Sequence, residues 1–84
     1  MASLANLERD QPLATVATDA AKAGDVDIVR RSLRQMRDQM KRDGTTQDAA
    51  RLLAKRGQRS QAIEMAKGIG DYNIRDQTLS ELAE

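Results

Sequence analysis

The sequence predicts an all-α domain of about five short antiparallel helices, arranged as stacked helical hairpins or as a small bundle. Apolar residues recur at spacings of three and four along most of the chain, which is typical of amphipathic helices. No stretch alternates like a strand, and Tyr72 is the only aromatic residue. Gly24 and Gly57 interrupt the helical pattern 33 residues apart. A length of 84 residues suits one domain, so we assign 1–84 to a single helical domain.

The first hairpin is predicted over residues 12–42, and residues 1–9 are expected to be a frayed end or a short covering helix. Pro12 suits a first helical turn, because its missing N–H would have no partner there. Asp10 or Gln11 would then cap this helix, which Gly24 ends. Its apolar face is formed by Leu13, Val16, Ala17 and Ala20.

The second helix is predicted to run from a cap at Asp25 to about Arg42, with a break at 43–45. Apolar residues spaced three and four apart give it a core stripe. The stripe consists of Val26, Val29, Leu33, Met36 and Met40.

A second hairpin is predicted over residues 46–69, followed by a last helix over 72–83. Thr45 or Thr46 would cap the third helix, and Gly57 would end it. Ser60 is expected to cap the fourth helix and Asp71 the fifth. The inner faces of these helices are expected to contain Ala49, Ala50, Leu52, Leu53, Ala62, Ile63, Ala66, Ile69, Ile74, Thr78, Leu79 and Leu82.

A shift of 33 residues superposes Ala21-Lys22-x-Gly24 on Ala54-Lys55-x-Gly57. A period in the low thirties is typical of stacked helical hairpins that cannot bury their apolar faces alone. On this pattern of small, large and turn positions the chain resembles the tetratricopeptide (TPR) repeat family over roughly residues 13–83. It departs from that family in lacking its aromatic residues and its proline. The resemblance implies a superhelical stack that binds a peptide or protein helix, and no chemistry.

The basic residues are concentrated in the middle of the chain. Residues 30–67 carry eleven basic and four acidic side chains, whereas residues 1–29 and 68–84 each have a net charge of −3. Spacings of four and three place a basic row along one side of the predicted second helix. This row could bind an acidic partner, or it could be a solvated helix face. Our candidates for partner binding are Arg30, Arg34, Arg37, Lys41, Arg51 and Lys55.

We therefore predict a non-enzymatic module that binds a protein or peptide partner. One alternative is a helix-turn-helix DNA-binding regulator using residues 47–67, where two helical patterns meet at Gly57 and several basic residues are present. The modest net charge of +1 and the single Tyr make nucleic acid the weaker prediction. The other alternative is a structural oligomerisation domain, so a homo-oligomer is also compatible with the sequence.

Several classes of protein are not predicted. The chain has no Cys and no His, which removes disulfides, thiolate metal sites and the usual proton-transfer residue. The carboxylates that lie close in sequence near the C-terminus, Asp71 with Asp76 and Glu81 with Glu84, are expected to serve as caps and surface charges. We expect no catalysis, no cofactor and no metal. No apolar run is long enough for a membrane span, so we expect no membrane contact and a cytoplasmic protein.

Overall fold

The computed structural model describes residues 4–83, with side chains from residue 8 onward, and these residues form five α-helices and no strand. The helices are α1 (Leu4–Ala23), α2 (Val26–Gln35), α3 (Gln39–Lys55), α4 (Arg59–Ala66) and α5 (Tyr72–Ala83). The predicted all-α class is therefore confirmed. No helix in this part of the chain combines the length and the apolar character needed to cross a membrane.

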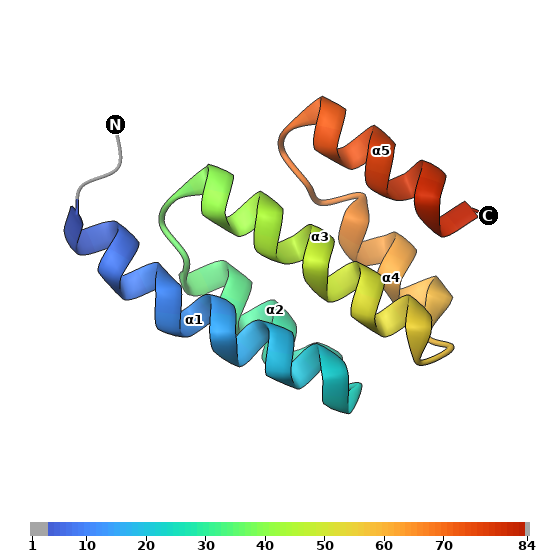
Figure 1. Ribbon diagram of the computed structural model, residues 1–84, viewed down its shortest axis with the longest axis horizontal. Helices are drawn as coiled ribbons and strands as arrows, with labels where there is room; N and C mark the ends of the chain where they lie inside the picture. The colour runs from blue at the N-terminus through green and yellow to red at the C-terminus, as the bar shows by residue number, and fades with distance from the viewer. Residues whose placement is uncertain (1–3, 84) are drawn as a thin grey trace.

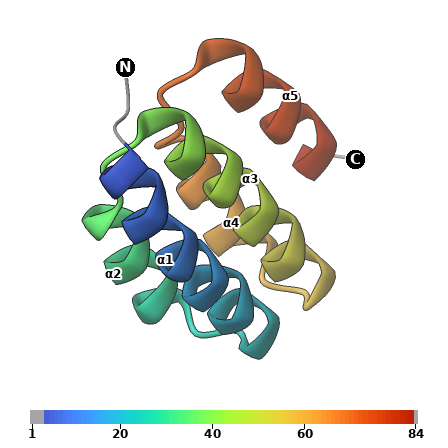
Figure 2. The same ribbon diagram turned by 60° about the vertical axis from the view of Figure 1, so that its left-hand side comes forward.

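The helices lie in two layers. Figure 1 shows α1, α3 and α5 side by side in one layer, with α2 and α4 behind them. Within this arrangement α1 packs on α2 and α3, while α3 also packs on α4 and α5. The view in Figure 2 shows the same two layers from the side of α1. Alanine faces line the contacts, since Ala17, Ala50 and Ala62 are fully buried, and their small side chains let helices approach closely.

Two glycine turns reverse the chain, between α1 and α2 and between α3 and α4. Gly24 and Gly57 have positive φ angles of 79° and 89°, a conformation that costs glycine little. Both turns have the same hydrogen bonds. The N–H of Gly24 donates to the carbonyl of Ala21 and that of Asp25 to Ala20 (3.0 and 2.8 Å), and the bonds around Gly57 repeat this pattern.

Two corners, at residues 36–38 and 69–71, connect the helix pairs to the next helix. At the first corner, the buried carboxylate of Asp10 in α1 accepts the N–H groups of Arg37 (3.0 Å) and Asp38 (2.7 Å). At the second, the buried Asp43 in α3 accepts the N–H groups of Gly70 and Asp71, both at 3.1 Å. We call these the carboxylate corners. Because Asp10 and Asp43 are 33 residues apart, the two corners repeat the period of the glycine turns.

The carboxylate corners correct the predicted boundaries of the second and third helices. The predicted helix to Arg42 ends instead at Gln35, because Met36 is extended and the next two N–H groups bond to Asp10 rather than to helix carbonyls. Asp38 then caps α3 by accepting from the N–H of Lys41 at 3.0 Å. The predicted break at 43–45 lies inside α3, where Thr45 and Thr46 donate to carbonyls one turn back instead of capping.

The start of α1 also differs from the prediction. The helix begins at Leu4, and Pro12 lies inside it on the exposed side. Proline has no N–H to donate to the carbonyl of Glu8 four residues back, but Glu8 is exposed, so water can reach it. Residues 4–9 are thus helical, while residues 1–3 lie outside the described part. Asp10 is not a cap but a buried residue in mid-helix.

Two predicted core residues are exposed. Val16 in α1 is 47% exposed. Met40 is 80% exposed, because α3 starts anew at Gln39 and turns it away from the α2 stripe. The first turn of α4 also differs, since its cap position is Gln58 rather than Ser60. By contrast, α5 spans the range predicted for the last helix, and Asp71 accepts from the N–H of Ile74 at 3.0 Å.

Candidate partner-binding groove

A groove of about 640 Å³ lies between α2 and α4, with α3 beneath it. We call it the α2–α4 groove. It is lined by Arg30, Leu33, Arg34, Arg42, Asp43, Thr46, Glu64, Met65 and Gly68. The groove exists because the second helix of each pair packs on the layer of α1 and α3 rather than closely on its own counterpart.

The floor of the groove is mostly buried and its rims are charged. Leu33 and Met65 contribute apolar surface from α2 and α4, with 8% and 6% of each residue exposed. Thr46 is also buried, and its hydroxyl donates to the Arg42 carbonyl at 2.7 Å. This hydroxyl proton is therefore not available to a ligand. The two apolar side chains from α2 and α4, beside a charged rim, make a surface suited to an amphipathic segment.

The two arginines on the α2 rim are the available charges of the groove. Arg30 and Arg34 are exposed and one helical turn apart. Among the described side chains, neither guanidinium takes part in a hydrogen bond or an ion pair. On the opposite rim, Glu64 is paired with Lys67 at 3.2 Å. The α2 rim is therefore the positive side of the groove.

The remaining charges in the groove have structural partners. Arg42 donates from Nη1 to the carbonyl of Met36 at 3.4 Å, across the first carboxylate corner. Asp43 uses both of its oxygens to hold the second corner. The floor is thus fixed by the same contacts that shape the chain, which keeps it in place when a ligand binds.

The predicted row of four basic residues is not a single row, which corrects the sequence prediction. Arg30 and Arg34 lie on α2, but Arg37 lies in the first carboxylate corner, where its N–H is held by Asp10. Lys41 belongs to the first turn of α3 and lines a separate hollow of about 250 Å³ beside Met40. Four residues would form one row only on an unbroken helix to Arg42, and the first carboxylate corner interrupts that helix after Gln35.

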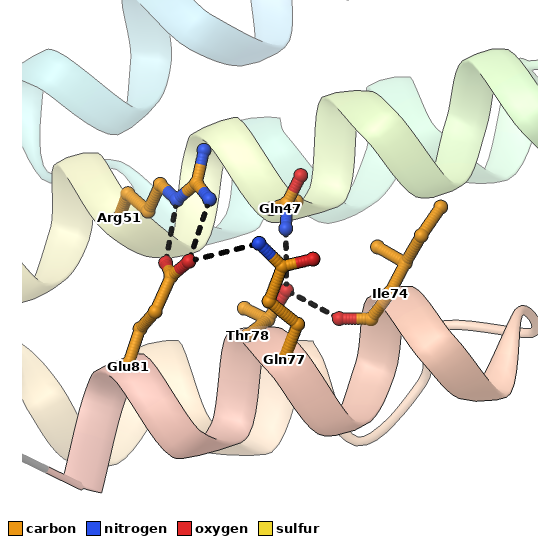
Figure 3. A network of polar contacts seen from close by, with 6 residues as sticks. All are labelled: Gln47, Arg51, Ile74, Gln77, Thr78 and Glu81. Atoms are coloured by element: carbon orange, nitrogen blue, oxygen red, sulfur yellow. Dashed lines mark hydrogen bonds and ion pairs between the residues drawn. The ribbon is translucent and has the colours of Figure 1, made fainter.

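Arg51 and Lys55 lie on the other face of the molecule. They line a hollow of about 380 Å³ between α1 and α3, together with Thr18, Lys22, Asp48 and Leu52. Figure 3 shows that Arg51 points toward α5, where Nε and Nη2 each donate to Glu81 at 2.8 Å. This bond lowers the pKa of Glu81 below its usual value. Nearby, Gln47 donates to the hydroxyl of Thr78 at 3.0 Å, so this network joins α3 to α5.

Two buried aspartates have roles that the sequence does not predict: Asp10, expected as a cap, and Asp43, expected in the break at 43–45. Of the two, Asp43 lines the groove. A signal for them is present: each is the second residue of an Arg-Asp dipeptide, at 9–10 and 42–43, and the dipeptide occurs again at 75–76 and, outside this period, at 37–38. The spacing of 33 residues is the same as that of Gly24 and Gly57. Within the described residues no group of His, Cys, Asp or Glu has an arrangement suited to a metal ion.

Comparisons with known proteins give no relative for this chain: no protein family, no curated protein and no solved structure matches it. The resemblance to TPR repeats therefore remains a prediction from sequence. Any functional conclusion has to come from the geometry of the molecule itself.

Proposed function

We propose that this protein is a non-enzymatic interaction module that binds an acidic, amphipathic protein segment in the α2–α4 groove. The observation that carries the proposal is the pair of guanidinium groups of Arg30 and Arg34, which have no partner among the described side chains and lie beside the apolar Leu33 and Met65. The segment would place one apolar side chain between Leu33 and Met65 and its carboxylates along the α2 rim. Arginine suits this role, since its planar fork can donate two bonds to one carboxylate.

The two parts of the groove have different tasks in this proposal. Exposed ion pairs contribute only about 0.2–1 kcal/mol each, so the arginines chiefly steer and orient the partner. Leu33 and Met65 have little exposed surface of their own, so the apolar contribution would come mainly from burying the partner's apolar side chain, at roughly 25 cal/mol per Å². Binding should therefore be moderate in strength and should weaken with salt, because the rim is within reach of screening ions.

A charge-reversal experiment tests the proposal. A fluorescent helical peptide with leucines and glutamates on one face is titrated into wild type and into the double variant Arg30→Glu/Arg34→Glu. The double variant replaces two attractions by two repulsions, so its affinity for the peptide should be weaker by about tenfold or more. The matched control is Arg31→Glu, an exposed arginine of α2 outside the groove. Equal affinities for wild type, control and double variant at low salt would refute the proposed site.

The two alternatives from the sequence can be separated from this proposal by simple measurements. For DNA binding, the second helix of the candidate motif would be α4, which exposes Ser60, Gln61 and the acidic Glu64. A duplex titration at two salt concentrations decides this alternative, because phosphate contacts make affinity fall steeply with salt. Sedimentation over a range of concentrations decides the oligomerisation alternative, which requires a concentration-dependent increase in mass.

A further inference from the structure

Helix α5 begins in the same way as α3, residue by residue. Asp38 and Asp71, which are 33 residues apart, each cap their helix by accepting an N–H three residues on, both at 3.0 Å. Thr45 and Thr78 occupy the next shared position, and each hydroxyl donates to the carbonyl four residues back at 2.7 Å. Helix α5 is thus a third copy of the helix that opens each pair.

The third copy includes the residue that forms the carboxylate corners. Asp10, Asp43 and Asp76 are spaced 33 residues apart, and each follows an arginine. The first two are buried, and each accepts two backbone N–H groups from a corner that lies 27 and 28 residues further along. The side chain of Asp76 is 69% exposed, and in the described structure its partner is the neighbouring Arg75 at 3.2 Å.

The face of α5 around Asp76 is uncovered where its counterparts are covered. Ala17 of α1 and Ala50 of α3 are fully buried under α2 and α4, but the equivalent Ala83 is exposed. Between Asp76 and Ala83 lies Leu79, which is partly buried and packs against the core, as does its counterpart Leu13 in α1. We call Asp76, Leu79 and Ala83 the α5 face. The two complete pairs show what covers such a face: a short helix and the corner that follows it.

We propose that the α5 face binds an amphipathic helix of a partner protein, and that Asp76 accepts the two N–H groups of the corner after that helix. The two helices that pack in the equivalent way on α1 and α3, namely α2 and α4, show which features the partner helix needs. Its helix carries apolar residues at the spacing of Val29, Leu33 and Met36, or of Ala62, Ala66 and Ile69, and all six of these are buried. The last of the three, Met36 or Ile69, directly precedes the two N–H groups that the aspartate accepts.

Charge also favours a basic partner helix. Residues 71–84 contain four acidic side chains and one basic one, so the end of the array that carries the α5 face is acidic. The helix that covers α1 has the opposite character, with Arg30, Arg31 and Arg34 on α2. A partner with the apolar spacing of α2 would match the shape of the α5 face, and basic residues on its outer side would be attracted to this acidic end of the molecule. This site shares no residue with the α2–α4 groove.

A peptide with the sequence of residues 25–41 of this chain is a suitable probe, because it contains α2, Met36 and the first corner. Its binding to the full-length protein is measured by titration, and amide shifts in an NMR spectrum locate the site. We expect binding with shifts on Asp76 to Ala83. Asp76→Asn should weaken the affinity about tenfold, since hydrogen bonds to a charged acceptor are lost. Ala83→Arg should also weaken it by blocking the approach of the helix.

The controls separate this site from a general charge effect. Asp19→Asn removes an exposed aspartate from α1 and should leave binding unchanged, as should the Arg30→Glu/Arg34→Glu variant of the groove. A peptide with Met36→Glu should not bind. The proposal is overturned if wild type does not bind the peptide, or if Asp76→Asn and Ala83→Arg bind it as well as wild type. Shifts confined to α1 would also overturn it, because the peptide would then be replacing α2.

Discussion

The chain reverses direction by two different devices, the glycine turns and the carboxylate corners. At Gly24 and Gly57 the turn is local, because a positive φ and two hydrogen bonds within six residues define it. At residues 36–38 and 69–71 the corner depends on a carboxylate that lies 27 or 28 residues earlier in the sequence. The first device needs only residues near each other in the sequence, whereas the second needs α1 or α3 in place to supply its carboxylate. The glycine turns form pairs, and the carboxylate corners fix the register between them.

The largest effect that separates the two devices is expected at Asp43. Asp43→Ala leaves the N–H groups of Gly70 and Asp71 without their acceptor and should lower the free energy of unfolding by roughly 2–3 kcal/mol. Urea denaturation measures this change. Asp48→Ala, an exposed aspartate of the same helix, is the control and should change stability by no more than about 0.5 kcal/mol. Similar losses for the two variants would mean that the corner is not held by Asp43.

A smaller loss is expected at the glycine turns. Gly57→Ala forces a side chain into the left-handed region, which should lower the free energy of unfolding by about 1–2 kcal/mol. No steric clash adds to this cost, because no atom beyond the neighbouring residues lies within 4 Å of a Cβ at this position. Gly24→Ala should cost more, since its Cβ would lie 2.6 Å from Oε1 of Gln58. Gln58 also donates to the Gly24 carbonyl at 3.2 Å and would have to move. Thermal denaturation of both variants checks this order, and the reverse order would contradict the packing of the two turns.

The carboxylate corner should also respond to acid. Burial raises the pKa of Asp10, but the N–H groups of Asp38 and Arg37 and the charges of Arg9 and Arg37 outweigh it, so the pKa is below its usual value. A lowered pKa in the folded state means that this stabilisation is present above the unfolded pKa of about 3.9 and is lost as the pH falls through the folded value. Urea midpoints at pH 6 and pH 3 should differ less in Asp10→Asn than in wild type. An unchanged pH dependence would show that Asp10 does not hold the corner as a carboxylate.

The smallest effect is expected for the ion pair between α3 and α5, which belongs to neither device. The side chains of Arg51 and Glu81 are 43% and 38% exposed, so solvent screens their attraction. Arg51→Ala should lower the free energy of unfolding by at most about 1 kcal/mol. A double-mutant cycle with Glu81→Gln isolates the pair. A coupling energy as large as the loss of stability in Asp43→Ala would mean that this ion pair, and not the carboxylate corners, fixes the register of the helices.

The two devices also differ in how far the sequence predicts them. The glycine turns follow from local chemistry, and so do the buried Val29, Leu33 and Met36, whose spacing indicates one helix face. The carboxylate corners could not be derived in this way. Nothing near Met36 ends a helix, so the apolar spacing appeared to continue to Met40, which is 80% exposed. The signal lies in the Arg-Asp dipeptides at 9–10, 42–43 and 75–76, which are 33 residues apart. A fourth at 37–38 does not follow this period, so the recurrence becomes meaningful only with the contacts in view.

The candidate site shows the same division. Arg30 and Arg34 were predicted from their spacing, and they do lie together on one rim of the α2–α4 groove. The floor could not be predicted, because Leu33 and Met65 meet only through the packing of two separate pairs on α3. The α5 face could not be predicted either. Spacing alone does not tell which of the three equivalent aspartates is buried.

Hydrogen exchange of the corner amides tests most directly whether remote carboxylates set the register of this array. We predict slow exchange for the N–H groups of Arg37, Asp38, Gly70 and Asp71 in wild type, although three of these four residues are exposed. In Asp43→Ala, Gly70 and Asp71 should become fast while Arg37 and Asp38 stay slow. Fast exchange at all four positions in wild type would contradict the account.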